Sequence, residues 1–244
     1  MSVNPMHQFE VYRIGPEIKF GEIDISFTNA SLFMALSAIS ILLILFAGSK
    51  NRSLVPSKIQ LIAEMSYTFI AKMISETAGS KAKPFFPFIF CLFMFVLFCN
   101  MIGMLPYSFT VTSHIIVTFT LAAFVFIGIT IIGFIKHGIR YIKIFVPSGV
   151  PILLLPLIIV IEIISYLSRP ISLSVRLFAN MMAGHTMLKV FGGFVISLGL
   201  LGGWLPLSFS VALTGLEILV AFLQAYVFAI LTCIYLNDAL NLQH

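Results

Sequence analysis

Five long apolar runs, separated by short polar or basic connections, account for most of this 244-residue sequence. Their lengths approach or exceed the roughly 20 apolar residues that an α-helix needs to cross a bilayer. Only 9% of the residues are charged, against about 25% in a soluble domain. We therefore predict an all-α polytopic membrane protein that forms a single membrane domain over residues 1–244. The expected spans are residues 32–47, 84–106, 115–134, 146–194 and 205–236, and the second and third are predicted to form a helical hairpin that opens on the outside.

Basic residues between the runs indicate the topology. Lys50, Arg52 and Lys58 follow the first run, and Lys136 and Arg140 follow the third. An excess of Lys and Arg marks the cytoplasmic or matrix side of a membrane. Both clusters agree with an N-terminus on the outside, where residues 1–30 form a short polar arm.

The connection between the first two runs has the pattern of an amphipathic helix. Ile59, Ile70 and Met73 share one face at 3.6-residue spacing, whereas Gln60 and Glu64 lie on the opposite face. Residues 56–79 are thus predicted to form an interfacial helix that lies on the membrane without crossing it.

The last two runs exceed the length of a perpendicular span and contain ionisable residues. We expect residues 146–236 to form two long, tilted helices packed as an antiparallel hairpin. The turn is marked by Gly199, Gly202, Gly203 and Pro206. No internal repeat is evident, which argues against the duplicated architecture of many secondary transporters.

Each of these two runs carries a polar stripe. Glu162, Arg169 and Arg176 are spaced by seven residues, so successive side chains drift by only about 20° around a helix. The last run repeats the pattern with Glu217 and Gln224. Arg176 is the most informative member, because arginine cannot lose its proton and is costly to place at bilayer depth.

Facing stripes predict a hydrated route for protons. In it Glu217 and His185 exchange protons, and Arg176 supplies a fixed positive charge near the middle. Structural readings stay open beside this one: Glu162 with Arg169 as a pair that holds helices together, and His185 as a packing residue. Asn180 and Gln224 cannot titrate, so they either orient water and Arg176 or join helices.

The segment Ser172-Leu-Ser-Val-Arg176-Leu-Phe-Ala-Asn180-Met-Met-Ala-Gly-His185 resembles the signature of the subunit a family of F-type ATP synthases. The resemblance covers nearly the whole chain. It includes Asn4-Pro5, Gln8-Phe9, Asn100, Gly103 to Pro106, Ser113-His114, Glu162 and the closing Gln224-Ala225-Tyr226-Val227-Phe228.

The resemblance implies a stator subunit with two offset half-channels beside a rotating ring of c subunits, so that proton flow drives ATP synthesis. Arg176 then looks like the essential arginine, His185 and Glu217 like relay residues of the outside half-channel, and Glu162 like an acidic lining residue on the other side. Asn180 and Gln224 look like polar neighbours of this path.

Partners and compartment follow from the same resemblance. The expected partners are the c-ring, the peripheral-stalk subunit b, other membrane-sector subunits and lipid, with no nucleic acid. The pairing of His185 with Glu217 looks mitochondrial or alphaproteobacterial, and the mitochondrial inner membrane is the favoured location.

Nucleotide and metal chemistry are not expected in this chain. It has no P-loop of the form G-x-x-x-x-G-K-[ST]. Cys91, Cys99 and Cys233 lie in apolar runs without metal-like spacing. We therefore predict no cofactor and no metal, and a proton-channel subunit that is not an enzyme by itself.

Three rival interpretations remain. The chain would be an autonomous proton or cation channel or antiporter if Glu162, Arg176 and Glu217 formed an ion site within it. It would be an assembly subunit of a respiratory complex if the stripes served only as helix contacts. A sodium-driven version of the same subunit is the third.

Overall fold

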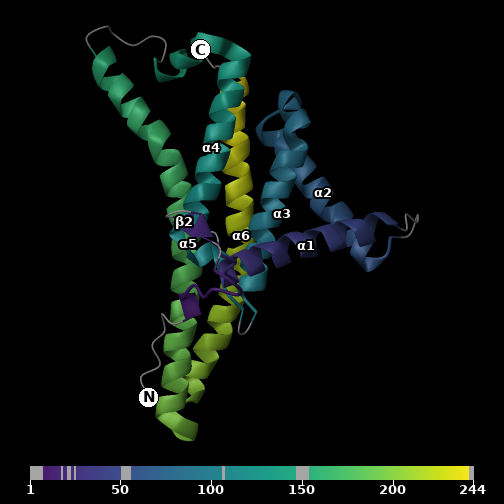
Figure 1. Cartoon of the computed structure of the whole chain (residues 1–244), viewed down its shortest axis with the longest axis vertical. Helices are drawn as coiled ribbons and strands as arrows, with labels where there is room; N and C mark the ends of the chain where they lie inside the picture. Colours follow the sequence, from purple (N-terminus) through teal and green to yellow (C-terminus); the bar gives the residue numbers. More distant parts are fainter. Residues whose placement is uncertain are drawn as a thin grey trace.

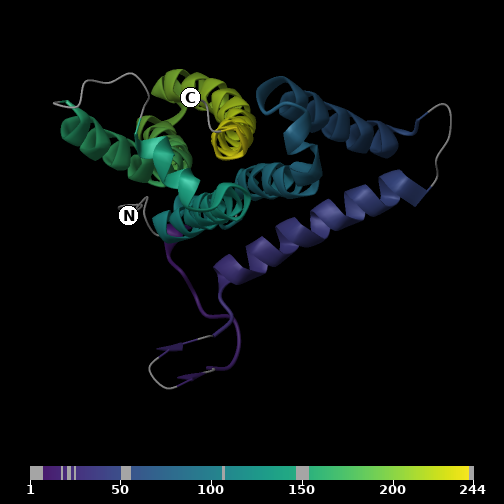
Figure 2. The same ribbon diagram turned by 90° about the horizontal axis from the view of Figure 1, so that it is seen from above.

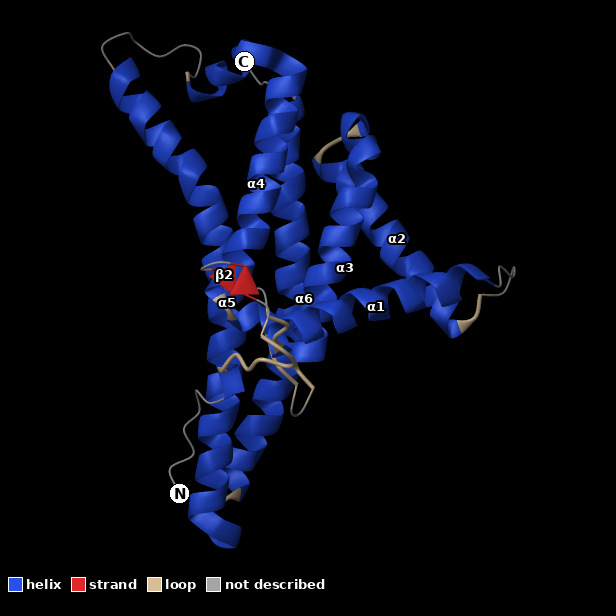
Figure 3. Cartoon of the chain, in the orientation of Figure 1, coloured by secondary structure: helices blue, strands red, loops and turns tan. Residues whose placement is uncertain are grey.

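The computed structural model describes residues 8–17, 19–20, 23–24, 26–50, 56–105, 108–146 and 154–241. These residues are almost entirely helical (Figures 1 and 3). Five helices are long and apolar enough to cross a membrane, which confirms the all-α polytopic class. The long α-helices are α1 (Asn29–Lys50), α2 (Lys58–Thr77), α3 (Phe86–Gly103), α4 (Ile115–His137), α5 (Leu155–Gly202) and α6 (Trp204–Leu240).

The N-terminal arm contains a small hairpin that the sequence reading did not anticipate. Strands β1 (Lys19–Phe20) and β2 (Ile23–Asp24) pair antiparallel. Asn29, the first residue of α1, accepts a hydrogen bond from the Tyr12 backbone N–H at 3.2 Å and donates one to the Glu10 carbonyl at 3.1 Å. The arm is therefore tied to the start of the first span. Asn4 and Pro5 lie outside the described residues.

Helix α1 packs against α2 and α3 and lies to one side of α4, α5 and α6. It lies crosswise to α4, α5 and α6 in Figure 1, and the view from above separates it from them (Figure 2). Among its residues only Ser37 and Gly48 are buried. Its 22 residues span about 33 Å at 1.5 Å per residue, which matches a hydrocarbon layer of about 30 Å.

Helix α2 fills the place predicted for the interfacial helix and is not among the candidate spans. Ser57 begins it as a capping residue that accepts from the Gln60 backbone N–H. The predicted polar face is partly wrong, because Gln60 is buried, close to Gly48 of α1, and donates to Glu64. The helix buries a face made of Gln60, Ile70, Met73 and Ile74 instead.

Three 3₁₀ helices flank α3 and α4, the predicted hairpin of spans two and three. η2 (Ser80–Phe85) leads into α3, and η4 (Gly138–Phe145) follows α4. Between α3 and α4 the chain forms η3 (Val111–Ser113), whose three residues are all buried. Pro106 and Tyr107 of this connection lie outside the described residues. The main core is formed by α3, α4 and α6, with Ile89, Val96, Val125, Phe228 and Leu236 almost inaccessible.

Helices α5 and α6 are consecutive, pack against each other and run in opposite directions, as predicted (Figure 1). Gly199 has a positive φ of 62°, and a sharp bend there leads into Gly203 between the two helices. Over its first turns α5 leans away from α6, and α4 packs against both (Figure 1). Pro170 lies inside α5, where it removes one backbone hydrogen bond.

The long helices require a strong tilt. With 48 residues α5 is about 72 Å long, and α6 with 37 residues is about 56 Å long, at 1.5 Å per residue. Both exceed the membrane thickness that α1 matches, and both run crosswise to α1 (Figure 1). If α1 follows the membrane normal, α5 and α6 lie steeply inclined to it.

Replacement by alanine should have opposite effects on stability at two glycines of α4. A Cβ at Gly133 would lie 2.4 Å from the buried Tyr141 ring, whereas a Cβ at Gly128 meets nothing within 4 Å. Gly133→Ala should lower the stability of the folded chain by about 1–3 kcal/mol through overpacking. Gly128→Ala should raise it by up to about 1 kcal/mol, because alanine favours a helix.

Thermal unfolding of the purified membrane complex, followed by the loss of this chain from it, measures both changes. Equal midpoints for the two variants would contradict the packing of Tyr141 on α4.

Candidate functional site

His185 of α5 and Glu217 of α6 meet across the helix pair. The His185 Nδ1 atom lies 3.5 Å from Glu217 Oε1, and the two side chains are 13% and 5% exposed. Neither Glu217 oxygen has a hydrogen-bond partner among the described residues. The pair predicted from the polar stripes is therefore assembled, although its two residues are 32 positions apart in the sequence.

Gly184 makes this approach possible. A Cβ at position 184 would lie 2.7 Å from Glu217 Oε1 and 2.9 Å from its Cδ. Any side chain at this position would thus compete with the carboxylate for the same space. The glycine before His185 is therefore part of the geometry of the pair.

Thr110 is a third member that the sequence reading missed. Its Oγ1 lies 3.0 Å from His185 Nε2, on the side of the imidazole opposite to Glu217. Thr110 precedes η3 in the connection between α3 and α4 and is 4% exposed. No pattern in the sequence pointed to it, because its partner lies 75 residues further along the chain.

Asn100 joins α3 to the same part of α6. It is fully buried, and its Nδ2 donates to the Ala221 carbonyl at 3.1 Å, one turn after Glu217. Its Oδ1 has no partner among the described residues. Buried polar atoms without protein partners are commonly satisfied by water. The unpartnered oxygens of Asn100 and Glu217 are thus two sites where a water molecule would complete the hydrogen bonding.

His114 lies beside this group, at the start of α4. Its ring stacks on Phe109 with the centroids 5.0 Å apart. Burial lowers the pKa of His114, so the neutral imidazole is favoured there. Its Nε2 has no hydrogen-bond partner in the part of the chain that the structure describes.

Arg176 occupies an exposed position on α5. No described residue forms a hydrogen bond or ion pair with it. Asn180 and Gln224, its predicted neighbours, are half-buried and likewise have no hydrogen bond to a described residue. The structure therefore leaves the guanidinium of Arg176 without a counter-charge among the described residues.

Arg169 has a different partner from the one considered in the sequence. Its Nη1 lies 3.2 Å from Asp238 Oδ2 of α6, so the pair with Glu162 is wrong. The guanidinium also lies over the rings of Tyr166 and Tyr235, at 5.3 and 4.9 Å from the centroids. Glu162 is half-buried and has no ion pair with any described residue.

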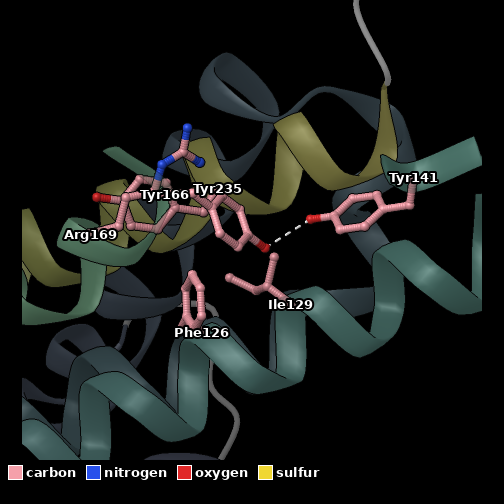
Figure 4. A pocket seen from close by; sticks show the side chains of 6 residues that line it. All are labelled: Phe126, Ile129, Tyr141, Tyr166, Arg169 and Tyr235. Atoms are coloured by element: carbon pink, nitrogen blue, oxygen red, sulfur yellow. Dashed lines mark hydrogen bonds between the residues drawn. The ribbon is translucent and has the colours of Figure 1, made fainter. Parts of the chain in front are cut away.

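Tyrosines extend this contact to α4 and η4. The Tyr166 hydroxyl lies 2.7 Å from Thr130 Oγ1 and 3.0 Å from the Tyr141 hydroxyl. Figure 4 shows Arg169, Tyr166, Tyr235 and Tyr141 around a small cavity of about 10 Å³. That volume is enough for about one water molecule. Arg169 thus joins α5 to α6 beside this cavity.

The comparisons with known proteins identify the family. The family model described as ATP synthase A chain matches residues 31–237. This chain belongs to that family. A protein of Pelagibacter ubique named ATP synthase subunit a is 80% identical over 244 residues and covers 100% of both chains. Proteins with the same name from Rhizobium leguminosarum and a Chelativorans strain are 60% and 57% identical, with 98–100% of each chain covered.

The relatives correct the expected compartment. They are alphaproteobacterial, so a bacterial inner membrane fits this ATP synthase A chain, and the mitochondrial inner membrane favoured by the sequence reading is not supported. The pairing of His185 with Glu217 was compatible with a mitochondrial or an alphaproteobacterial source. The identity of the whole chain to alphaproteobacterial relatives favours the second.

Removing the partner of Arg169 should destabilise the helix pair. The Arg169 side chain is 20% exposed, so the pair is neither fully exposed nor fully buried. Asp238→Asn should therefore lower the stability by an amount between those for surface and buried pairs, about 1–3 kcal/mol. Glu162→Gln removes a half-buried acid that has no described partner and is the matched control. The thermal midpoint of the complex should fall for Asp238→Asn and stay near wild type for Glu162→Gln. The opposite order would contradict the ion pair.

Proposed function

We propose that this chain is the proton-translocating stator subunit of an F-type ATP synthase and works against a rotating c-ring. The observation that carries the proposal is Arg176, a permanent charge on an exposed face of a membrane helix, with no partner among the described residues. Such a charge requires a counter-charge, and a carboxylate on a neighbouring subunit supplies one.

The two ends of the helix pair lie toward opposite sides of the proposed topology. Thr110, in the connection assigned to the outside, contacts His185. Lys81, in the basic connection assigned to the cytoplasm, donates to Asn241 just after α6 at 2.7 Å. The contact of His185 with Glu217 thus belongs to the outside, whereas Asp238 and Glu162 belong to the cytoplasmic side.

Arg176 separates these two groups. Along α5 it stands seven residues after Arg169 and nine before His185, or about 10 and 13 Å at 1.5 Å per residue. Protons from outside reach the ring through Glu217 and His185, and they leave toward the cytoplasm past Glu162. Asn180 and Gln224 orient water and the ring carboxylate between them.

The fixed charge directs the transfer. A ring carboxylate that comes to face Arg176 has its ionised form stabilised, so it must first release its proton to the exit side. The same charge opposes the direct passage of a proton from one half-channel to the other. One charge moving through 100 mV supplies about 2.3 kcal/mol, so several protons are required for each ATP.

Partners cover the remaining apolar surface. Leu42, Leu43 and Phe46 of α1 are each more than 60% exposed, and in a membrane such side chains face lipid or another subunit. We propose the c-ring on the face of Arg176, and subunit b together with other membrane-sector subunits elsewhere. The N-terminus lies outside, in the periplasm. Nucleotide chemistry resides in other subunits of the complex.

Substitution of Arg176 tests the proposal. Arg176→Ala should abolish ATP-driven acidification of inverted membrane vesicles in which the complex is assembled. Arg176→Lys should fail as well, because an ammonium at bilayer depth that the c-ring covers can lose its proton and then no longer forms a permanent barrier.

Normal acidification by an assembled Arg176→Ala complex would show that the arginine is structural. Proton flux through liposomes that contain only this chain would favour an autonomous channel or antiporter instead.

The space left by Gly184 generates a second test. Gly184→Ala places a methyl group where the Glu217 carboxylate lies, so the carboxylate must move away from His185. We expect acidification to fall at least about tenfold, since small displacements of proton-transfer partners have large effects on rate.

Gly192→Ala is the matched control on the same helix, because a Cβ there meets nothing within 4 Å. Equal pumping by the two variants, each in an assembled complex, would contradict the role of the pair.

A further inference from the structure

Thr110 Oγ1 has two partners with different hydrogen-bonding abilities. The Gly103 carbonyl oxygen at 3.2 Å can only accept, whereas His185 Nε2 at 3.0 Å can donate or accept according to its tautomer. The hydroxyl carries a single proton. When that proton is donated to Gly103, the Thr110 oxygen remains free to accept from an N–H on His185 Nε2.

The surroundings hold Thr110 in this position. A Cβ at Gly103 would lie 2.8 Å from Thr110 Cγ2, so the glycine allows a close approach of the threonine to the end of α3. Ser113 Oγ donates to the Thr110 carbonyl at 2.6 Å, which fixes the backbone from the other side. Thr110 is thus a buried and well-defined acceptor, unlike a hydroxyl on a mobile surface loop.

We propose that Thr110 is a positioning residue that holds His185 in the tautomer with the proton on Nε2, so that Nδ1 exchanges a proton with Glu217. The inference rests on the proposed function and specifies the atoms of its outer proton relay. A neutral imidazole with Nε2–H has its lone pair on Nδ1, and that atom faces Glu217 Oε1 at 3.5 Å.

The proton balance is simple in this arrangement. The O–H bond of a protonated Glu217 breaks as the Nδ1–H bond forms, which gives a carboxylate and an imidazolium. The Nε2–H bond and the Thr110 hydroxyl stay unchanged in both states. Transfer therefore needs no reorientation beyond the closing of one 3.5 Å gap.

The other tautomer would block this step. With the proton on Nδ1, the Thr110 hydroxyl would have to turn from the Gly103 carbonyl to donate to Nε2. Nδ1 would then have no lone pair to receive a proton from Glu217. Thr110 acts through His185 and does not itself give up or take a proton.

Three threonine variants separate this role from simple packing. Thr110→Val keeps the shape but removes the acceptor, and Thr110→Ser keeps the hydroxyl. Thr118→Val is the matched control, because Thr118 is fully buried and, among the described residues, its hydroxyl bonds only to the backbone carbonyls of His114 and Ile115 at the start of its own helix. ATP-driven acidification by assembled complexes should fall about tenfold or more in Thr110→Val, as for other partners that orient a functional histidine. Thr110→Ser and Thr118→Val should stay within about twofold of wild type, because a substitution that spares the site geometry leaves its proton transfer intact.

The tautomer can be observed directly by ¹⁵N solid-state NMR of the histidine-labelled complex, with the His185 signals assigned by their loss in His185→Gln. We expect an unprotonated Nδ1 and a protonated Nε2 in the neutral wild-type ring, and a mixed population in Thr110→Val.

Each contrary result overturns the inference. These results are a protonated Nδ1 in the neutral wild-type ring, wild-type pumping by Thr110→Val, or equal loss in Thr110→Ser and Thr110→Val. If Thr110→Val does not assemble, the wild-type spectrum decides. None of these outcomes touches the proposed function, which the Arg176→Ala complexes and the liposomes that contain only this chain test separately.

Discussion

An ionisable side chain in a lipid environment must be paired, hydrated or neutral, and this requirement organises the helix pair α5 and α6. Arg169 is paired with Asp238 and covered by two tyrosine rings. Glu217 is buried beside His185. Arg176 has neither a hydrogen bond nor an ion pair with any described residue. Toward one end of the hairpin Arg169 is paired with Asp238, toward the other Glu217 is buried beside His185, and the charge between them is left open to a neighbour.

The supporting helices place those charges by close packing. Asn100 reaches from α3 to the backbone of α6, and Thr110 reaches from the connection after α3 to His185 on α5. Gly103 lets Thr110 approach the end of α3, and Gly184 lets the Glu217 carboxylate approach α5, each within a distance that a side chain would prevent. The α3–α4 hairpin is thus more than a membrane anchor, because it sets the geometry around His185 and Glu217.

Much of this arrangement was predictable from the sequence, and the errors have physical causes. Span positions followed from apolar runs, whose lengths are fixed by the membrane thickness. The partner of Arg169 was missed because Glu162 and Arg169 lie two turns apart on one helix, whereas Asp238 comes from the antiparallel neighbour. Gln60 was assigned to a solvated face, but a polar side chain can be buried where Gly48 lets α1 and α2 approach and Glu64 accepts its amide.

The sequence by itself determined that the chain spans a membrane with helices and that Arg176 has no acid within a turn. These properties depend on composition and on periodicity along one helix, and both are local. Only the tertiary structure decided that His185 meets Glu217, that Thr110 takes the other imidazole nitrogen, and that Arg176 has no partner among the described residues. Contacts between helices depend on helix tilt, helix rotation and the packing of small residues. Residues that lie far apart in the chain determine these jointly.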